Sequence, residues 1–251
     1  MAVSIKSARE IEMMREAGRL LAEVHEELGK AIRPGMTTLE IDIMGERLIR
    51  ERDCVPNFLH YNGYPASICV SVNDEVVHGI PSKRRILQEG DIVSLDAGLI
   101  YKGYHSDAAR TYGVGEIAPE LQQLIDETRN SFYAGIKMAK AGNHLHDISN
   151  AIDAYISQFG YGIVRELVGH GIGTALHEDP QIPNFRQERR GLKLQPGMTL
   201  AIEPMINLGR SDVVFLDDDW TVAAEDGLPS AHYENTILIT DGEPEILTLI
   251  K

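Results

Sequence analysis

The sequence has few cysteines and a shortage of positive charge. Only Cys54 and Cys69 occur in 251 residues, too few for a secreted scaffold held by disulfides. The two thiols could pair, but two lone cysteines favour a reduced, cytoplasmic setting. Lys and Arg total 24 against 38 Asp and Glu, a formal net charge of −14. This balance argues against broad electrostatic binding to nucleic acid or to an anionic membrane.

Long apolar runs and linker-like segments are also missing. No apolar run approaches the ~20 residues that a membrane-spanning helix needs, and residues 1–6 lack the apolar core of a signal peptide. No stretch rich in Pro, Gly or Ser divides the chain. We therefore expect one domain over residues 1–251, built from two halves at roughly 1–115 and 116–251.

Helix and strand signals recur in the same order in both halves. Capping boxes, Pro and Gly breakers and apolar spacing predict four helices, over residues 7–30, 37–52, 119–140 and 146–159. Alternating or continuous apolar segments predict strands at 67–72, 162–168, 198–206 and 232–240. A hairpin is expected between Asp91 and Val114, turning at Lys102-Gly103.

Two segments that lie 107 positions apart look like copies of each other. The segment from Leu87 to Asp96 matches that from Leu194 to Glu203, so two acids occupy the same place in apolar strands. Gly35 and Gly142 keep this offset. The next matching segments, residues 105–107 and 232–234, are 127 positions apart. We interpret the pattern as a duplication with a longer second hairpin.

The predicted hairpin brings two of these acids together. With a two-residue turn, Asp96 faces Ala109, and Asp107 becomes its diagonal neighbour on the same face. The equivalent arrangement in the second half joins Glu203 and Glu234. A buried carboxylate is costly unless a cation or hydrogen bonds compensate it, so four of them facing one another predict a metal centre.

A nitrogen ligand for this centre is available in the glycine-flanked His170. Four carboxylates and one imidazole form an oxygen-rich donor set that suits Mn²⁺, Fe²⁺ or Co²⁺, with Zn²⁺ also compatible. Four negative charges exceed the need of one divalent ion, so two ions about 3.5–4 Å apart are expected. Taken singly, each acid could be a strand-edge or ion-paired residue, and His170 a turn or core histidine. The joint pattern outweighs these alternatives.

These residues resemble the metal ligands of the methionine aminopeptidases. The resemblance extends from about Ser4 to the C-terminus and is carried by the five candidate ligands and by short motifs at residues 77–81, 169–173, 176–178, 196–199 and 202–205. It implies an α/β (α+β) "pita-bread" fold, in which helices cover a curved antiparallel sheet with a dimetal site at the centre of two pseudo-symmetric halves. The short segment from His177 to Glu203 is similar to that of the bacterial-type, type I enzymes.

The activity that the resemblance implies is hydrolysis of the peptide bond after an N-terminal methionine, with small second residues favoured. Asp96, Asp107, His170, Glu203 and Glu234 would hold two divalent ions, and Glu203 would also shuttle a proton. His78 and His177 would contact the substrate and the tetrahedral intermediate. The methionine pocket would use Tyr61, Tyr64, Cys69 and Trp220, with Phe58 at its rim.

Some details of the pocket depart from familiar relatives. Some of them carry Cys in place of Phe58 and an aromatic residue in place of Leu176. The resemblance also implies a monovalent cation bound by backbone carbonyls at Asn73, Glu75 and Ser230. The expected partners are N-terminal methionines of peptides and nascent chains, and a transient ribosome contact is compatible with this role. No membrane binding and no stable nucleic-acid binding are expected. A monomer is expected.

Three other interpretations compete with this one. A proline-specific dipeptidase of the same fold usually carries an extra N-terminal domain. A non-catalytic peptide-binding module on this fold typically loses metal ligands, and all five residues are present here. An oxygen-activating iron protein usually needs two histidines and one carboxylate, which the acid-rich set does not match.

Overall fold

The structure is a computed structural model that describes residues 3–250. Its helices are α1 (Ala8–Ala31), α2 (Thr38–Arg50), α3 (Pro119–Ile136) and α4 (Leu145–Ile156), with a short 3₁₀ turn η1 (Tyr61–Gly63). Its strands are β1 (Val55–Pro56), β2 (Ile68–Val72), β3 (Glu75–Val77), β4 (Ile92–Tyr101), β5 (Tyr104–Gly113), β6 (Gly162–Ile163), β7 (Gly169–Gly171), β8 (Glu178–Ile182), β9 (Thr199–Ile202), β10 (Met205–Asn207), β11 (Val213–Phe215), β12 (Val222–Ala224), β13 (Ser230–His232), β14 (Glu234–Leu238) and β15 (Glu245–Ile246). Among the described residues, no helix combines the length and apolar character needed to cross a membrane.

The first two helices begin where the sequence predicts. Ser7 and Glu10 form a reciprocal capping box at α1, and Thr37 and Glu40 form another at α2. Helix α3 ends four residues before the predicted end, because the backbone tightens into i→i+3 turns after Ile136. The four helix predictions are therefore confirmed in position, with small errors at their ends.

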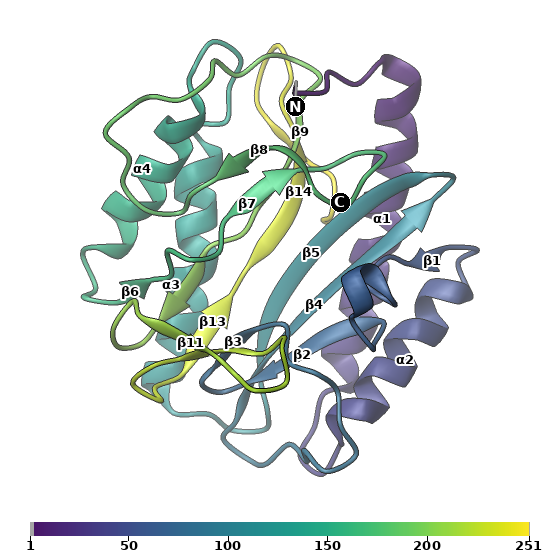
Figure 1. The fold of residues 1–251 in the computed structure, drawn as a ribbon, viewed down its shortest axis with the longest axis vertical. Helices are drawn as coiled ribbons and strands as arrows, with labels where there is room; N and C mark the ends of the chain where they lie inside the picture. Colours follow the sequence, from purple (N-terminus) through teal and green to yellow (C-terminus); the bar gives the residue numbers. More distant parts are fainter. Residues whose placement is uncertain (1–2, 251) are drawn as a thin grey trace.

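Both halves of the chain contribute strands to one antiparallel sheet. Nine strands join in the order β1-β4-β5-β14-β9-β7-β8, with β2 paired to β4 and β15 paired to β14. The seam between the halves is the pair β5 and β14, which runs through the centre of the molecule (Figure 1). Helices α1 and α2 lie against the half that contains β4 and β5, and α3 and α4 lie against the other half (Figure 1).

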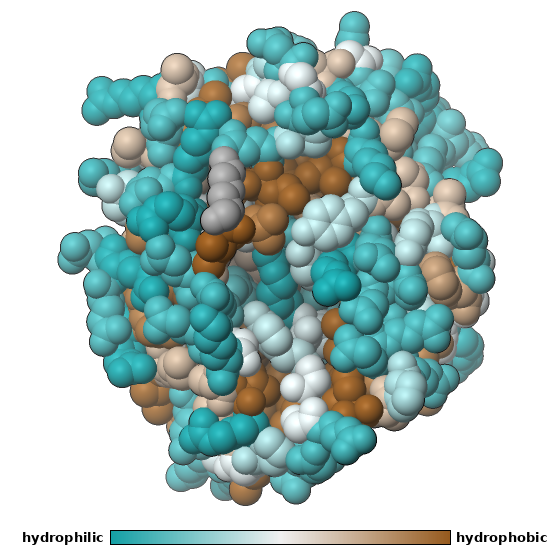
Figure 2. Space-filling model, turned by 180° about the vertical axis from the view of Figure 1, so that it is seen from behind, coloured by the Kyte–Doolittle hydropathy of each residue, from teal (hydrophilic) through white to brown (hydrophobic). Residues whose placement is uncertain are grey.

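Alternation along the strands divides the sheet into a core face and a site face. On β4, Val93, Leu95 and Ala97 are buried in the core with α1 and α2. On the other half, Leu200 and Ile237 are buried in the core with α3 and α4. The residues between them project to the opposite face. Seen from the helix side, the surface is largely hydrophilic, with apolar atoms gathered in a hollow near the top of the view (Figure 2).

The register of the first hairpin confirms the prediction. Tyr101 pairs with Tyr104 and Asp96 with Ala109. Lys102 and Gly103 both have positive φ, at 48° and 87°, as a two-residue type I′ turn requires.

Three predicted strands are wrong in extent. The strand over 162–168 is only β6, and the stretches 198–206 and 232–240 are each two strands. The stretch 198–206 breaks at Glu203-Pro204, since Pro204 has no N–H for the ladder. The stretch 232–240 breaks at Tyr233, whose N–H donates to the Pro204 carbonyl. At both breaks the chain leaves one sheet for another, because β10 and β13 pair in a separate three-stranded sheet.

Candidate metal centre

Three adjacent strands bring Asp96 and Glu234 into one row. Asp96 on β4 pairs with Ala109 on β5, which pairs in turn with Glu234 on β14. Directly paired residues project to the same face of a sheet. Asp107 lies two residues from Ala109 on β5, so it joins the same face.

The second half supplies the remaining candidates from the same face. His170 on β7 pairs with Ala201 on β9, and Glu203 follows two residues after Ala201. Asn235 pairs with Ile202, so Glu234 and Glu203 are the next residues across the two strands. The sequence prediction of a diagonal pair like that of Asp96 and Asp107 is therefore wrong for the second half, where the pair is direct.

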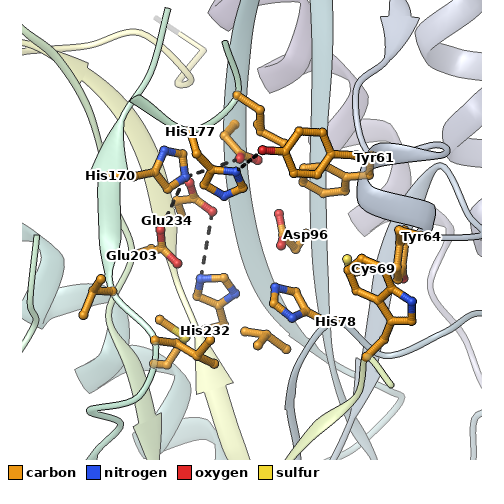
Figure 3. Close-up of a pocket in the computed structure, with 18 of the residues that line it drawn as sticks. Tyr61, Tyr64, Cys69, His78, Asp96, His170, His177, Glu203, His232 and Glu234 are labelled. Atoms are coloured by element: carbon orange, nitrogen blue, oxygen red, sulfur yellow. Dashed lines mark hydrogen bonds and ion pairs between the residues drawn. The ribbon is translucent and has the colours of Figure 1, made fainter. Parts of the chain in front are cut away.

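The side chains of this face converge within a short span. One ligand atom each from Asp107, His170 and Glu234 lie within 4.8 Å of one another. The His170 Nε2 atom is 3.6 Å from the Glu203 Oε1 atom and 3.9 Å from the Asp107 Oδ2 atom. His170, Glu203, Glu234 and Asp96 surround the same space in Figure 3.

The tautomer of His170 is set by its own strand. Its Nδ1 lies 2.8 Å from the Gly171 carbonyl oxygen, so Nδ1 carries the proton and donates there. Burial, and next the neighbouring His177, lower the pKa of His170 to about 3. The ring is therefore neutral, and its Nε2 lone pair faces the carboxylates, as a metal ligand requires.

Without a cation, the four acids are strongly perturbed. Burial raises the pKa of Asp96 to about 7. Burial, followed by repulsion from neighbouring acids of the cluster, raises the pKa of Asp107, Glu203 and Glu234 well above their ordinary values. Repulsion among buried like charges is the pattern expected of a site built around a cation.

Unpartnered oxygens show that the donor set fits a divalent metal. Asp96 Oδ1, Asp107 Oδ1 and Glu234 Oε1 are buried and have no hydrogen-bond partner. Within residues 3–250, neither lysine nor arginine lines the cavity around them. An oxygen-rich set with one imidazole and no compensating side-chain cation matches the preference of Mn²⁺, Fe²⁺, Co²⁺ or Zn²⁺.

A cavity of about 270 Å³ opens beside the acids. The cavity is lined by all five candidate ligands and by every residue predicted to bind substrate, namely Phe58, Tyr61, Tyr64, Cys69, His78, His177 and Trp220. Its remaining lining residues are Asn62, Val77, Leu167, Val168, Leu176, Met205 and His232. The structure thus brings together residues from the whole length of the chain, although their roles remain predictions.

Aromatic contacts give the apolar end of the cavity its shape. The Trp220 ring meets the Tyr64 ring edge-on at 5.1 Å between centroids. The Tyr64 hydroxyl donates to the Gly79 carbonyl at 2.9 Å, which fixes that ring. Cys69 pairs with Asp96 across β2 and β4, so its thiol lies beside the acids at the base of the pocket (Figure 3).

Two further histidines line the cavity, His177 with its ring centroid 4.3 Å from that of His170, and His78. The His177 Nδ1 atom lies 2.8 Å from the Tyr61 hydroxyl oxygen, and the two rings are adjacent in Figure 3. His78 has φ of 60°, a left-handed conformation that is uncommon outside glycine and clusters at functional sites. Burial, and next His177, lower the pKa of His78 to about 4, so its ring is neutral.

The sequence interpretation missed His232, a buried residue of this cavity. Burial, and next His78, lower its pKa to about 3, and its Nε2 lies 3.9 Å from the Glu234 Oε2 atom. One signal was available, because His232 precedes Glu234 by two positions and so faces the same side of an extended chain.

The segments predicted to hold a monovalent cation lie close to one another. The Ser230 N–H donates to the Asn73 carbonyl at 2.9 Å, and Glu75 begins β3 close to β13. Cation binding there remains a prediction.

Comparison with known proteins identifies relatives along almost the full chain. The model of metallopeptidase family M24 matches residues 12–241. Methionine aminopeptidase from Clostridium acetobutylicum is 51% identical over 98% of this chain and 99% of its own length. The crystal structure of methionine aminopeptidase from Thermotoga maritima superposes with a TM-score of 0.97 at 44% identity, covering 99% of this chain and 100% of that one.

A more distant structural neighbour is a different peptidase. Xaa-Pro dipeptidase from Bacillus anthracis has a TM-score of 0.77 at 27% identity, with 98% of this chain covering 62% of that longer protein. The fold of this chain is accordingly the pita-bread fold that its neighbours share.

Proposed function

Since the chain belongs to metallopeptidase family M24, we propose that it removes the N-terminal methionine from peptides and nascent chains by metal-dependent hydrolysis, favouring small second residues. The observation that carries the proposal is the oxygen-rich face of Asp96, Asp107, Glu203 and Glu234 with His170, placed at one end of an aromatic cavity. The names of the full-length relatives support this choice of substrate. The protein is a metalloaminopeptidase.

The five candidate ligands would hold two divalent ions, drawn from Mn²⁺, Fe²⁺, Co²⁺ and Zn²⁺. When bound, such ions supply a water ionised near neutral pH and polarise the scissile carbonyl. Four buried carboxylates match the charge of two divalent ions, and the unpartnered oxygens of Asp96, Asp107 and Glu234 are free to face them. The physiological metal is part of this proposal and of the experiment below.

Side chains of the cavity orient the substrate and carry its protons. Glu203, the most exposed of the four acids, would accept a proton and deliver it to the leaving amine. The Tyr61 hydroxyl, 2.8 Å from Nδ1 of His177, would donate to that nitrogen and leave the proton of the ring on Nε2. His177 and His78 would donate hydrogen bonds to the substrate carbonyl and to the oxyanion that develops from it.

The shape of the cavity suits an unbranched thioether side chain. Tyr61, Tyr64, Trp220 and Phe58 offer aromatic surfaces to a methionine sulfur, and such contacts favour Met. Leu176 is buried in the same apolar cluster as Phe58, so these two residues set the width of the pocket.

The proposal extends to the whole chain. Residues 1–251 would act as one catalytic domain, because both halves of the chain contribute strands to a single sheet. Cys54 and Cys69 are buried and unpaired, which supports a reduced, cytoplasmic location. We propose a monomer that meets nascent chains with at most a transient ribosome contact.

The test is cleavage of a Met-Ala-Ser peptide by metal-stripped protein resupplied with each divalent ion in turn. We expect turnover to return with Mn²⁺, Fe²⁺ or Co²⁺ and to be abolished in Asp107→Ala, which should keep its circular dichroism spectrum. The matched control is Asp126→Ala, which removes a partly exposed acid on α3, away from the cavity, and should be as active as the parent. Full activity and unchanged metal content in Asp107→Ala would refute the role of this acid.

The dipeptidase alternative is tested with the same protein. The Xaa-Pro dipeptidase neighbour motivates Ala-Pro as the competing substrate. We expect cleavage of Met-Ala-Ser and no cleavage of Ala-Pro. The opposite preference would replace the aminopeptidase proposal by a dipeptidase, and stoichiometric metal without turnover of either would favour a binding module.

A further inference from the structure

His232 is a buried polar side chain to which the proposed reaction gives no role. It is 2% exposed, and neither ring nitrogen has a hydrogen-bond partner. A neutral imidazole carries one donor and one acceptor, and leaving buried polar groups unpaired is unfavourable. A buried ring that keeps both nitrogens free therefore requires an explanation.

The backbone around His232 is held firmly, whereas its ring is not bonded. Its N–H donates to the Thr111 hydroxyl at 2.8 Å, and its carbonyl accepts from the same hydroxyl at 2.9 Å. This double contact fixes the end of β13 against β5. The ring is left to project into the cavity, where it lies beside His78 and below Glu234 (Figure 3).

The group that faces this ring is the carboxylate of Glu234. Nε2 of His232 lies 3.9 Å from Oε2 of Glu234, and a small rotation of either side chain would bring them to hydrogen-bond distance. The other oxygen, Oε1, is buried without a partner. Arg110 donates to the backbone carbonyl of Glu234 and not to its side chain.

The Glu234 side chain thus lies close both to the His232 ring and to ligand atoms of Asp107 and His170. Carboxylates that bind metals are commonly held by hydrogen bonds to neighbouring side chains, and loss of such a partner typically weakens metal binding by about 10–100-fold. His232, at the end of the neighbouring strand β13, is placed to supply this hydrogen bond.

We propose that His232 is a positioning residue: its Nε2–H donates to Oε2 of Glu234 and holds this carboxylate in place at the metal centre. The inference rests on the proposed two-metal site and adds a residue to it. His232 acts through Glu234, so its loss should weaken metal binding and lower kcat while leaving KM for the peptide nearly unchanged.

The experiment is calorimetric titration of Mn²⁺ into metal-stripped protein carrying His232→Leu or His232→Gln. We expect about 10–100-fold weaker binding in the leucine variant. The glutamine variant keeps an N–H donor and should stay within about threefold of the parent. His25→Leu is the matched control, because His25 is equally buried but lies on the core face, where Nε2 donates to the Ala108 carbonyl at 2.8 Å. It should lower stability without changing Mn²⁺ affinity.

The result that overturns the proposal is parental Mn²⁺ affinity in a folded His232→Leu protein, or equal losses in the His232 and His25 variants. If His232→Leu does not fold, His232→Met keeps the volume without a donor and takes its place. Failure of the proposed function is distinguishable, because parent protein that binds Mn²⁺ but does not cleave Met-Ala-Ser would leave the role of His232 intact. Parent protein that binds no Mn²⁺ would overturn both.

Discussion

At the scale of single residues, alanines are as important to the site as acids. Ala109 lies between Asp96 and Glu234 in one row across three strands, and Ala201 lies next to His170 in the other half. Both alanines are fully buried. A larger side chain at either position would fill the space into which the carboxylates converge.

Ala109→Leu should therefore abolish metal binding. The added side chain would push Asp96 and Glu234 apart, since both are direct cross-strand neighbours of Ala109. The measurement is metal content after dialysis against Mn²⁺.

The control at this position is Ala109→Gly, which leaves the space open. It should cost about 0.5–1 kcal/mol of stability and retain the metal. Equal metal content in both variants would mean that the row does not need a small residue at its centre.

At this scale, the positions of the acids could be predicted only where the sequence fixes the pairing register of the strands. Asp96 and Asp107 could be placed on one face from the sequence, because a two-residue turn fixes the pairing of a hairpin. No equivalent turn joins β9 to β14, so the direct pairing of Glu203 with Glu234 could not be predicted. His232 was missed because its one signal, a position two residues before Glu234, does not form a recognisable motif.

At the scale of elements, the loop that carries His177 is held by the N-terminal segment. Nζ of Lys6 lies 2.5 Å from the Glu178 carboxylate, with side-chain exposures of 3% and 15%. The same carboxylate accepts hydrogen bonds from the backbone N–H groups of Thr174 and Ala175. The Lys6 N–H also donates to the Gly197 carbonyl, so Lys6 connects this loop to the segment before β9.

Breaking this ion pair should destabilise the protein and disturb His177. Lys6→Met leaves a nearly buried carboxylate without its cation, which typically costs about 3–5 kcal/mol. We expect a lower urea midpoint and a lower kcat/KM for Met-Ala-Ser.

Two variants test this explanation. Arg9→Met removes an exposed cation nearby and should change the urea midpoint little. Lys6→Met combined with Glu178→Leu should recover part of the lost stability, since no unpaired charge remains. Equal urea midpoints for Lys6→Met and the parent would show that the Lys6–Glu178 ion pair does not stabilise the protein.

The elements most poorly predicted are those that change sheets. Capping boxes and apolar spacing predicted the helices, and the confirmed starts at Ser7 and Thr37 reflect purely local chemistry. The break at Pro204 had a local signal in the proline itself, but the break at Tyr233 depends on a contact of its N–H with the Pro204 carbonyl, which local patterns do not encode. The Lys6–Glu178 pair was likewise beyond prediction, because 172 positions separate its members.

At the scale of the whole molecule, the halves are joined by β5 and β14. Arg110 strengthens this seam from the core face. It donates to the Glu234 carbonyl, to the Asn235 side chain and to the Thr248 carbonyl, and its guanidinium stacks on the Tyr233 ring at 4.5 Å. The centre is thus assembled from both halves, so its electrostatics should influence the stability of the entire fold.

Metal-free protein should lose stability as the pH rises from 7 to 8.5. In the unfolded chain these carboxyls have pKa values of about 4, whereas in the folded chain burial and mutual repulsion raise the pKa of Asp107, Glu203 and Glu234. The folded state then holds more protons, so each retained proton lowers the free energy of unfolding by about 1.4 kcal/mol per pH unit. This loss of stability is expected only above pH 6.5. Below that pH, the buried histidines, whose pKa values are lowered in the folded chain, make stability rise with pH instead.

Divalent ions should remove this pH dependence. They replace the retained protons, and Mn²⁺ at 100 times its dissociation constant adds about 2.7 kcal/mol of stability. The measurement is Tm at pH 7 and 8.5, with EDTA and with Mn²⁺. A Tm that rises with pH in EDTA would show that these acids are compensated by groups of the chain itself.

The position of β14 has a consequence for synthesis of the chain. This strand lies between β5 and β9 in the finished sheet, yet it follows both of them in the chain. A product that ends before residue 234 would keep Asp96, Asp107, His170 and Glu203 but lack the strand that joins the two halves. Catalytic competence should therefore be withheld until β14 has been synthesised, and copies that end before it should be inert.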